Sequence, residues 1–178
     1  MTLADQLTVA RAVSVPVVVV LFVLDFEGHA YWATALFGAS MLTDQVDGWL
    51  ARRAGTTTDL GRILDPVADK ILVMATLIVL VPTLPAWMVA AIAAREFVVS
   101  GLRLAALERG VVVSARDLAK VKTWSQGIAA GLGGLALGGA FDERIAWWGL
   151  LVALAFTLLS GLDYARAAPA LLRGRQAA

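Results

Sequence analysis

Four aspartates with a regular spacing are the residues of this chain best suited to chemistry. Asp44 and Asp47 are three positions apart and Asp65 and Asp69 are four apart, so each pair shares one face if its segment is helical. Four carboxylates held close together require cations, because like charges repel strongly in a low-dielectric site. Oxygen ligands without histidine or cysteine favour hard ions, so we expect Mg²⁺, with Mn²⁺ or Ca²⁺ next. Ion pairing with nearby basic residues is the structural alternative, but it does not require a shared face on two helices.

Two glycines and an arginine accompany these aspartates. Gly48 follows Asp47 directly, Gly61 precedes Asp65 by four positions, and Arg52 lies one helical turn after Gly48. Glycine allows a ligand or another backbone to approach closely, and the guanidinium fork of arginine suits a phosphate. The set therefore predicts a diphosphate held by two divalent ions.

The rest of the chain has the composition of a membrane protein. Of its 178 residues, 60% are hydrophobic and only 16% charged, and the mean hydropathy is +0.78, well above the usual mix of a soluble domain. An acidic residue inside a membrane costs roughly 3 kcal/mol on insertion scales, so it favours a functional role. The absence of cysteine excludes disulfides and thiolate metal sites. We expect a single domain over residues 1–178, with membrane lipids and no nucleic acid as partners.

Six apolar stretches are long enough to cross a hydrocarbon core of roughly 30 Å. They predict an all-α, integral membrane bundle of six transmembrane helices, preceded by a short interfacial segment at residues 2–7. The short loop at 53–59 would form a helical hairpin that turns the two aspartate pairs toward each other. The stretches are residues 9–24, 31–51, 63–81, 86–107, 119–140 and 145–165.

The charges in the breaks predict the orientation of this bundle. If the N-terminus is cytoplasmic, the outward breaks carry Asp25, Glu27, Asp142 and Glu143 with one basic residue, Arg144. The positive-inside rule then places both termini and the aspartates at the cytoplasmic face. Within the fifth stretch, glycines from 127 to 139 at small-xxx-small spacing predict close helix packing.

A second polar cluster follows in the fourth and fifth stretches. Arg95 and Glu96 lie deep in a predicted span, which favours an internal ion pair. The other basic residues gather toward the cytoplasmic end, where contact with lipid headgroups is the structural alternative. A basic pocket beside an acidic metal site would suit an acceptor that carries its own phosphate. These basic residues are Arg103, Arg116, Lys120 and Lys122.

The acidic run D-x2-D-G-x2-A-R-x8-G-x3-D-x3-D resembles, at every fixed position, the signature of the CDP-alcohol phosphotransferase family of membrane enzymes. The resemblance implies a six-helix and usually homodimeric fold that displaces CMP from a CDP-linked lipid or alcohol with an acceptor hydroxyl. It makes Asp44, Asp47 and Asp65 ligands of two divalent ions, and Asp69 both a ligand and the general base. It also implies contacts to the CDP-lipid from Thr8, Arg11, Gly48, Arg52, Thr58 and Gly61.

The R-E-x3-S-x2-R run at 95–103 and the K-x-K-T-x2-Q run at 120–126 resemble the phosphatidylglycerophosphate synthase branch of that family. The opening D-Q-L-T-x2-R and the segment 160–164 are also similar to it, although Asp5 stands where Asn is usual and Ala119 where Gly is usual. The resemblance implies transfer of a phosphatidyl group from CDP-diacylglycerol to sn-glycerol 3-phosphate at the cell membrane. The acceptor's phosphate would contact Arg103, Arg116, Lys120 and Lys122.

Two other functions fit parts of the pattern. Inositol phosphate also carries a phosphate and would use the same basic cluster. A cation transporter would also place carboxylates in a membrane, but it predicts them along a path across the bilayer, whereas these cluster at one level.

Overall fold

The computed structural model describes the backbone of residues 3–54, 70–108 and 117–173, and the side chains of residues 13–43, 70–106 and 121–162. These described parts of the chain contain six helical segments and no strand, which confirms the prediction of an all-α fold. The helices are α1 (Leu3–Val23), α2 (His29–Ala54), the segment Lys70–Val79, α4 (Ala86–Glu108), α5 (Asp117–Leu137) and α6 (Glu143–Arg173).

The helices follow the predicted apolar stretches with two differences at the ends of the chain. α1 is continuous from Leu3 to Val23, so the interfacial segment expected at residues 2–7 is not a separate element. α6 continues to Arg173, beyond the apolar stretch that ends at 165. Residues 166–173 contain two arginines and Pro169 among alanines and leucines. The helix continues through them, so the apolar stretch underestimates its length.

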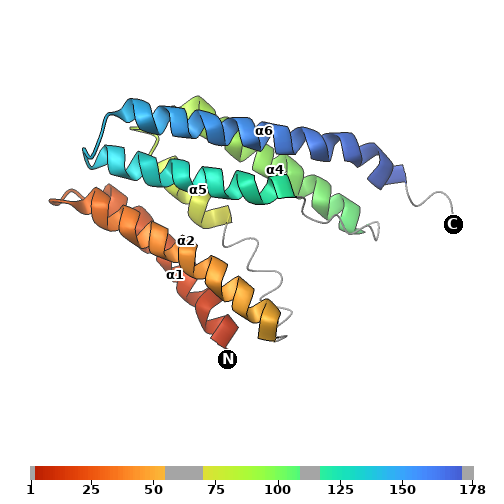
Figure 1. Cartoon of the computed structure of the whole chain (residues 1–178), viewed down its shortest axis with the longest axis horizontal. Helices are drawn as coiled ribbons and strands as arrows, with labels where there is room; N and C mark the ends of the chain where they lie inside the picture. Colours follow the sequence, from red (N-terminus) through yellow and green to blue (C-terminus); the bar gives the residue numbers. More distant parts are fainter. Residues whose placement is uncertain (1–2, 55–69, 109–116, 174–178) are drawn as a thin grey trace.

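The connections before α2, α4 and α6 lie at the same end of the bundle (Figure 1). We call this the turn end. It is the arrangement that an up-and-down bundle with short breaks requires. The last turn is fixed locally: Gly139 has a φ of 79°, and the amides of Gly139 and Ala140 donate to the carbonyls of Ala136 and Leu135, as in a Schellman cap. Asp142 Oδ1 then accepts from the Arg144 amide at 2.8 Å and caps α6.

α5 lies at the centre of the bundle. It packs against α2 on one side and α6 on the other, while α1 packs on α2 and α4 on α6. The core contains Phe22, Phe37, Leu77, Met88 and Leu150, all buried. Because these side chains come from five helical segments, burial of apolar surface joins the whole bundle.

The glycines of α5 permit much of this close packing. A Cβ atom at Gly134 would lie 2.1 Å from Thr34 Oγ1, and one at Gly127 would lie 2.2 Å from Met41 Cε, both on α2. Gly138, directly after α5, faces Tyr31, which also lies on α2. The predicted packing role is confirmed at these positions, whereas Gly131 has no atom within 4 Å of its Cβ position.

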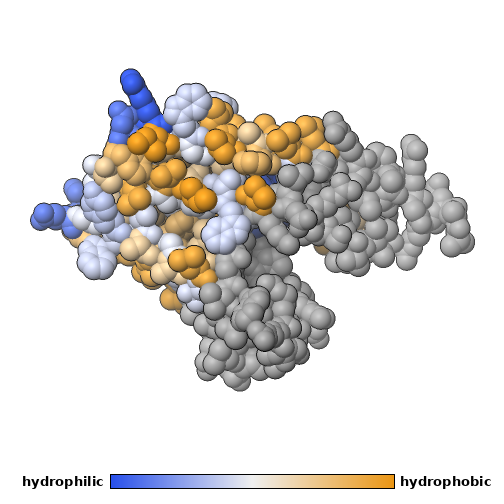
Figure 2. All heavy atoms as spheres, viewed as in Figure 1, coloured by the Kyte–Doolittle hydropathy of each residue, from blue (hydrophilic) through white to orange (hydrophobic). Residues whose placement is uncertain are grey.

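The exterior of the bundle is largely apolar. Figure 2 shows hydrophilic side chains gathered at the turn end of the visible face and apolar side chains along the helices. Phe97 is 78% exposed and Trp32, Trp87 and Trp148 are each more than 60% exposed. In the described residues, one helical stretch, Glu143–Leu162 of α6, is long and apolar enough by composition to span a membrane. The six spans and the orientation of the termini stay predictions.

Candidate active site

The acidic run begins on a continuous helix. α2 is unbroken from His29 to Ala54, so Asp44 and Asp47 lie about one turn apart on one face, followed by Gly48 and Arg52 on the same helix. This backbone arrangement agrees with the spacing argument for the first aspartate pair. The side chains of these four residues lie outside the described part of the chain.

Other predicted site residues fall outside the described residues entirely or in part. Asp65, Asp69, Thr58, Gly61 and Arg116 lie in the segments that are not described. Thr8 lies on α1 with Arg11, and Lys120 lies on α5, each with a described backbone only. Among the side chains that are described, no three His, Cys, Asp or Glu residues form a group that could hold a metal ion.

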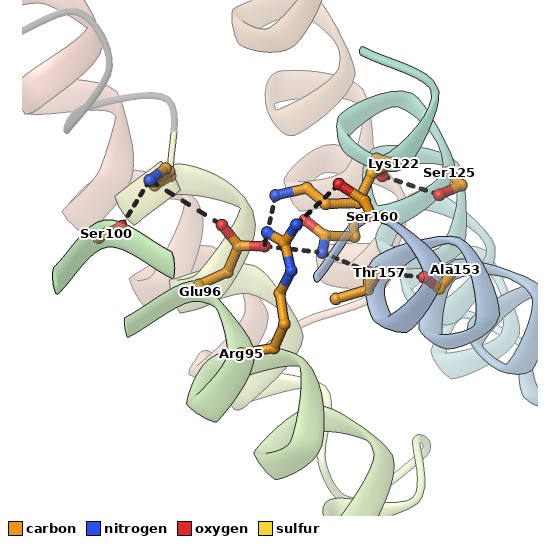
Figure 3. A network of polar contacts seen from close by, with 10 residues as sticks. Arg95, Glu96, Ser100, Lys122, Ser125, Ala153, Thr157 and Ser160 are labelled. Carbon is orange, nitrogen blue, oxygen red and sulfur yellow. Dashed lines mark hydrogen bonds and ion pairs between the residues drawn. The ribbon is translucent and has the colours of Figure 1, made fainter. Parts of the chain in front are cut away.

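The second polar cluster is a buried network between α4, α5 and α6 (Figure 3). Arg95 Nη1 donates to Glu96 Oε1 at 3.0 Å, which confirms the predicted internal ion pair. The ammonium of Lys122 donates to the same Glu96 oxygen. Gln126 Nε2 lies 3.4 Å from this oxygen, so three donors from α4 and α5 surround it. We call these residues and their partners the Glu96 network.

Two side chains of α6 complete the inner side of this network. Ser160 Oγ accepts from Arg95 Nη2 at 2.7 Å, and Thr157 Oγ1 accepts from Gln126 Nε2 at 2.8 Å. Both hydroxyls are buried. Gly161 leaves room for the arginine, because a Cβ atom there would lie 3.2 Å from Arg95 Cγ. The network therefore ties α4 and α5 to α6 inside an otherwise apolar core.

Lys70 connects the network to the acidic run. It follows Asp69 directly in the sequence and begins the described segment Lys70–Val79. Its ammonium donates to Ser100 Oγ at 2.7 Å and lies 4.0 Å from Glu96 Oε2. Glu96 thus has a cation on each carboxylate oxygen. Among the described side chains of this network, one carboxylate faces three cations: Lys70, Arg95 and Lys122.

A small cavity of about 10 Å³ lies between these groups, lined in part by Lys70, Glu96, Lys122, Thr123 and Gln126. This volume is on the scale of a single water molecule. A larger open groove of about 590 Å³ runs between α5 and α6, lined mainly by apolar side chains such as Trp124, Ile128 and Phe156. The polar chemistry of the described residues is therefore concentrated at the Glu96 network.

Sequence reasoning missed the partners that lie far apart in the chain. The spacing arguments did not predict Lys70 or Thr157 as members of this network. A signal was present in the sequence, because Thr157 and Ser160 are polar residues three positions apart in an apolar helix. That spacing places both on one face, where buried polar groups require partners.

These features are those of a helical membrane enzyme that handles phosphates: an apolar exterior, a helix that carries paired aspartates, and a buried cluster rich in cations. Comparison with known proteins agrees. The family profile described as CDP-alcohol phosphatidyltransferase matches residues 1–159. The chain therefore belongs to the CDP-alcohol phosphatidyltransferase family and is a transferase of that class.

Several curated relatives cover most of the chain. It is 39% identical to the CDP-diacylglycerol–glycerol-3-phosphate 3-phosphatidyltransferase of Bacillus subtilis (strain 168), over 91% of this chain and 92% of the relative. It is 38% identical to the probable phosphatidylglycerophosphate synthase of Mycobacterium tuberculosis (strain CDC 1551 / Oshkosh), over 91% of this chain and 79% of the relative. A Rickettsia bellii (strain RML369-C) protein with the same name as the Bacillus relative is 35% identical, over 93% of this chain and 94% of its own length.

Proposed function

We propose that the chain transfers the phosphatidyl group of CDP-diacylglycerol to sn-glycerol 3-phosphate, giving phosphatidylglycerophosphate and CMP in phospholipid biosynthesis. The complete acidic run of the family carries this proposal, because its residues supply the reaction type. The names of relatives that align with nine-tenths of the chain support the choice of acceptor. The buried excess of cations around Glu96 supports an acceptor with a phosphate of its own.

The aspartates fit a site for two Mg²⁺ ions, with Mn²⁺ as the alternative. Their donors are all oxygens, which hard ions prefer, and the continuity of α2 gives Asp44 and Asp47 a common face. Asp65 and Asp69 would complete the ligand set. When bound, the ions supply charge neutralisation for the diphosphate.

The chain's own residues would then perform the transfer. Asp69 takes the proton of the 1-hydroxyl of glycerol 3-phosphate, and that oxygen attacks the lipid-side phosphorus of CDP-diacylglycerol. A phosphorus–oxygen bond forms to the acceptor, the bond to the bridging oxygen breaks, and CMP leaves with the electron pair of that bond. The CDP-lipid would be held during this exchange by contacts from Thr8, Arg11, Gly48, Arg52, Thr58 and Gly61.

The acceptor's phosphate would be bound by basic residues of α4, α5 and the segment between them. Lys122 supports this assignment because its ammonium lies in a cluster where cations exceed carboxylates. A phosphate held there would place the hydroxyl in line with the diphosphate. The residues of this subsite are Arg103, Arg116, Lys120 and Lys122.

The enzyme would act in the plasma membrane as a homodimer of six-span subunits, with the active site and both termini at the cytoplasmic face. The exposed Trp32, Trp87 and Trp148 support a membrane interface at the turn end. Each lies within the first two turns of a helix that begins at the turn end, as in the aromatic belt of a membrane interface. If the termini and the active site are at the cytoplasmic face, the turn end faces away from the cytoplasm.

A purified sample assayed for CMP release would test the proposal. With CDP-diacylglycerol and Mg²⁺, release should depend on glycerol 3-phosphate, stop with a chelator, and fall to background in Asp69→Asn. CMP release with inositol phosphate but not with glycerol 3-phosphate would favour the alternative acceptor. Metal transport without CMP release would favour a transporter.

A further inference from the structure

Glu96 is the centre of the buried polar contacts in the described residues. Its Oε1 atom accepts from Lys122 and Arg95, and its Oε2 atom faces Lys70 at 4.0 Å. Arg95 is tied to Ser160 of α6, so the carboxylate has a fixed support behind it. One buried carboxylate therefore holds the ammonium of Lys122 directly, whereas Lys70 has its close hydrogen bond to Ser100.

Both lysines lie next to the segments that the proposed reaction uses. Lys70 follows Asp69, and Lys122 belongs to the K-x-K-T run. A lysine side chain loses rotamer freedom when its ammonium is fixed. A partner that holds its ammonium before the ligand arrives removes part of that cost from binding.

The small cavity indicates that Glu96 supports Lys122 without competing with a phosphate for it. At about 10 Å³, the space between Lys70, Glu96 and Lys122 is on the scale of one water molecule. A phosphate group therefore does not fit between the carboxylate and the lysines. An ammonium has three N–H donors, so Lys122 keeps two donors for other acceptors while it is bonded to Glu96.

We propose that Glu96 is a positioning residue for the phosphorylated acceptor: it fixes the ammonium of Lys122 at the acceptor subsite and touches no substrate itself. This inference rests on the proposed function, because it assumes an acceptor with a phosphate. It assigns Glu96 to the acceptor and not to the CDP-lipid. Loss of Glu96 should therefore weaken acceptor binding only.

A double-mutant cycle between Glu96 and Lys122 tests this inference. Glu96→Gln keeps the size of the side chain and removes the charge, and it should raise KM for glycerol 3-phosphate about tenfold. Both kcat and KM for CDP-diacylglycerol should stay within about twofold of wild type. Lys122→Gln should also raise the acceptor KM, and the double variant should not exceed the larger single effect, because Glu96 acts through Lys122.

Thr76→Val is the matched control, since it removes a buried hydroxyl that bonds within its own helical segment, outside the Glu96 network, and should leave the acceptor KM unchanged. If Glu96→Gln cannot be purified in a folded form, Glu96→Asp serves instead, because it keeps the charge but withdraws it by one methylene and should raise the acceptor KM by a smaller factor.

An unchanged acceptor KM, equal losses for both substrates, or additive effects in the cycle would each overturn the inference. Failure of the proposed function would look different, because the wild-type enzyme itself would not use glycerol 3-phosphate. If wild type uses inositol phosphate, the same cycle is measured with that acceptor.

Discussion

Replacing Gly134 by alanine should destabilise the bundle, because this glycine lies where α5 meets α1 and α2. An added Cβ would lie 2.1 Å from Thr34 Oγ1 and 3.0 Å from Phe22 Cζ. Thr34 is not free to move without cost, since its hydroxyl donates to the Ala30 carbonyl at 2.7 Å. Phe22 is buried in the core and has little room to retreat.

The expected magnitude follows from two opposing terms. Forcing a methyl group into a packed interface costs about 1–3 kcal/mol, whereas alanine gains about 1 kcal/mol over glycine in a helix interior. Gly134→Ala should therefore lower the free energy of unfolding by up to about 2 kcal/mol, which corresponds to a Tm lower by up to several degrees for a chain of this length.

Gly131→Ala is the matched control for this variant. It lies on the same helix, one turn earlier, with no atom within 4 Å of the Cβ position. It should leave the Tm unchanged or raise it. Thermal unfolding in detergent, followed by circular dichroism, compares the two variants with wild type. A Gly134→Ala protein as stable as wild type, or equal losses in both variants, would refute the packing argument.

The remaining predictions concern buried polar groups, a helix cap and the CDP-lipid. Thr157→Val should lower the free energy of unfolding by about 1–2 kcal/mol, because Gln126 loses its hydroxyl partner. The control Thr76→Val removes only a bond to its own helix and should lower the free energy of unfolding by less. Equal Tm losses in the two variants would contradict this prediction. Asp142→Ala should cost about 1 kcal/mol of stability through the lost cap of α6, and an unchanged Tm would show that the cap is dispensable. Arg52→Gln should raise KM for CDP-diacylglycerol about tenfold without changing KM for the acceptor, and kinetics with the opposite pattern would remove Arg52 from the CDP-lipid site.

Much of the helical architecture could be predicted from apolar stretches and short breaks. Hydropathy found the positions of the helices because burial and helical length are local properties of the sequence. It did not show that α1 is continuous from Leu3 or that α6 reaches Arg173, since charged residues near these ends lower the hydropathy without ending the helix.

The polar network could be predicted only in part. The pair Arg95 and Glu96 was found because adjacent charges deep in an apolar stretch need an internal partner. The bond from Arg95 to Ser160 joins residues 65 positions apart, and no local pattern gives such a pairing. The link from Lys70 to Glu96 depends on how two helices pack, which spacing within either helix does not determine.

The central claim is that an acceptor hydroxyl displaces CMP by attack on the lipid-side phosphorus. Its most direct test uses glycerol 3-phosphate labelled with ¹⁸O at the 1-hydroxyl, purified enzyme, CDP-diacylglycerol and Mg²⁺, with products identified by mass spectrometry. The label should appear in phosphatidylglycerophosphate, and the CMP released in equal amount should carry none. Two results would contradict the proposed function. One is a labelled product that contains CMP, formed together with phosphatidate. The other is release of CMP without formation of phosphatidylglycerophosphate.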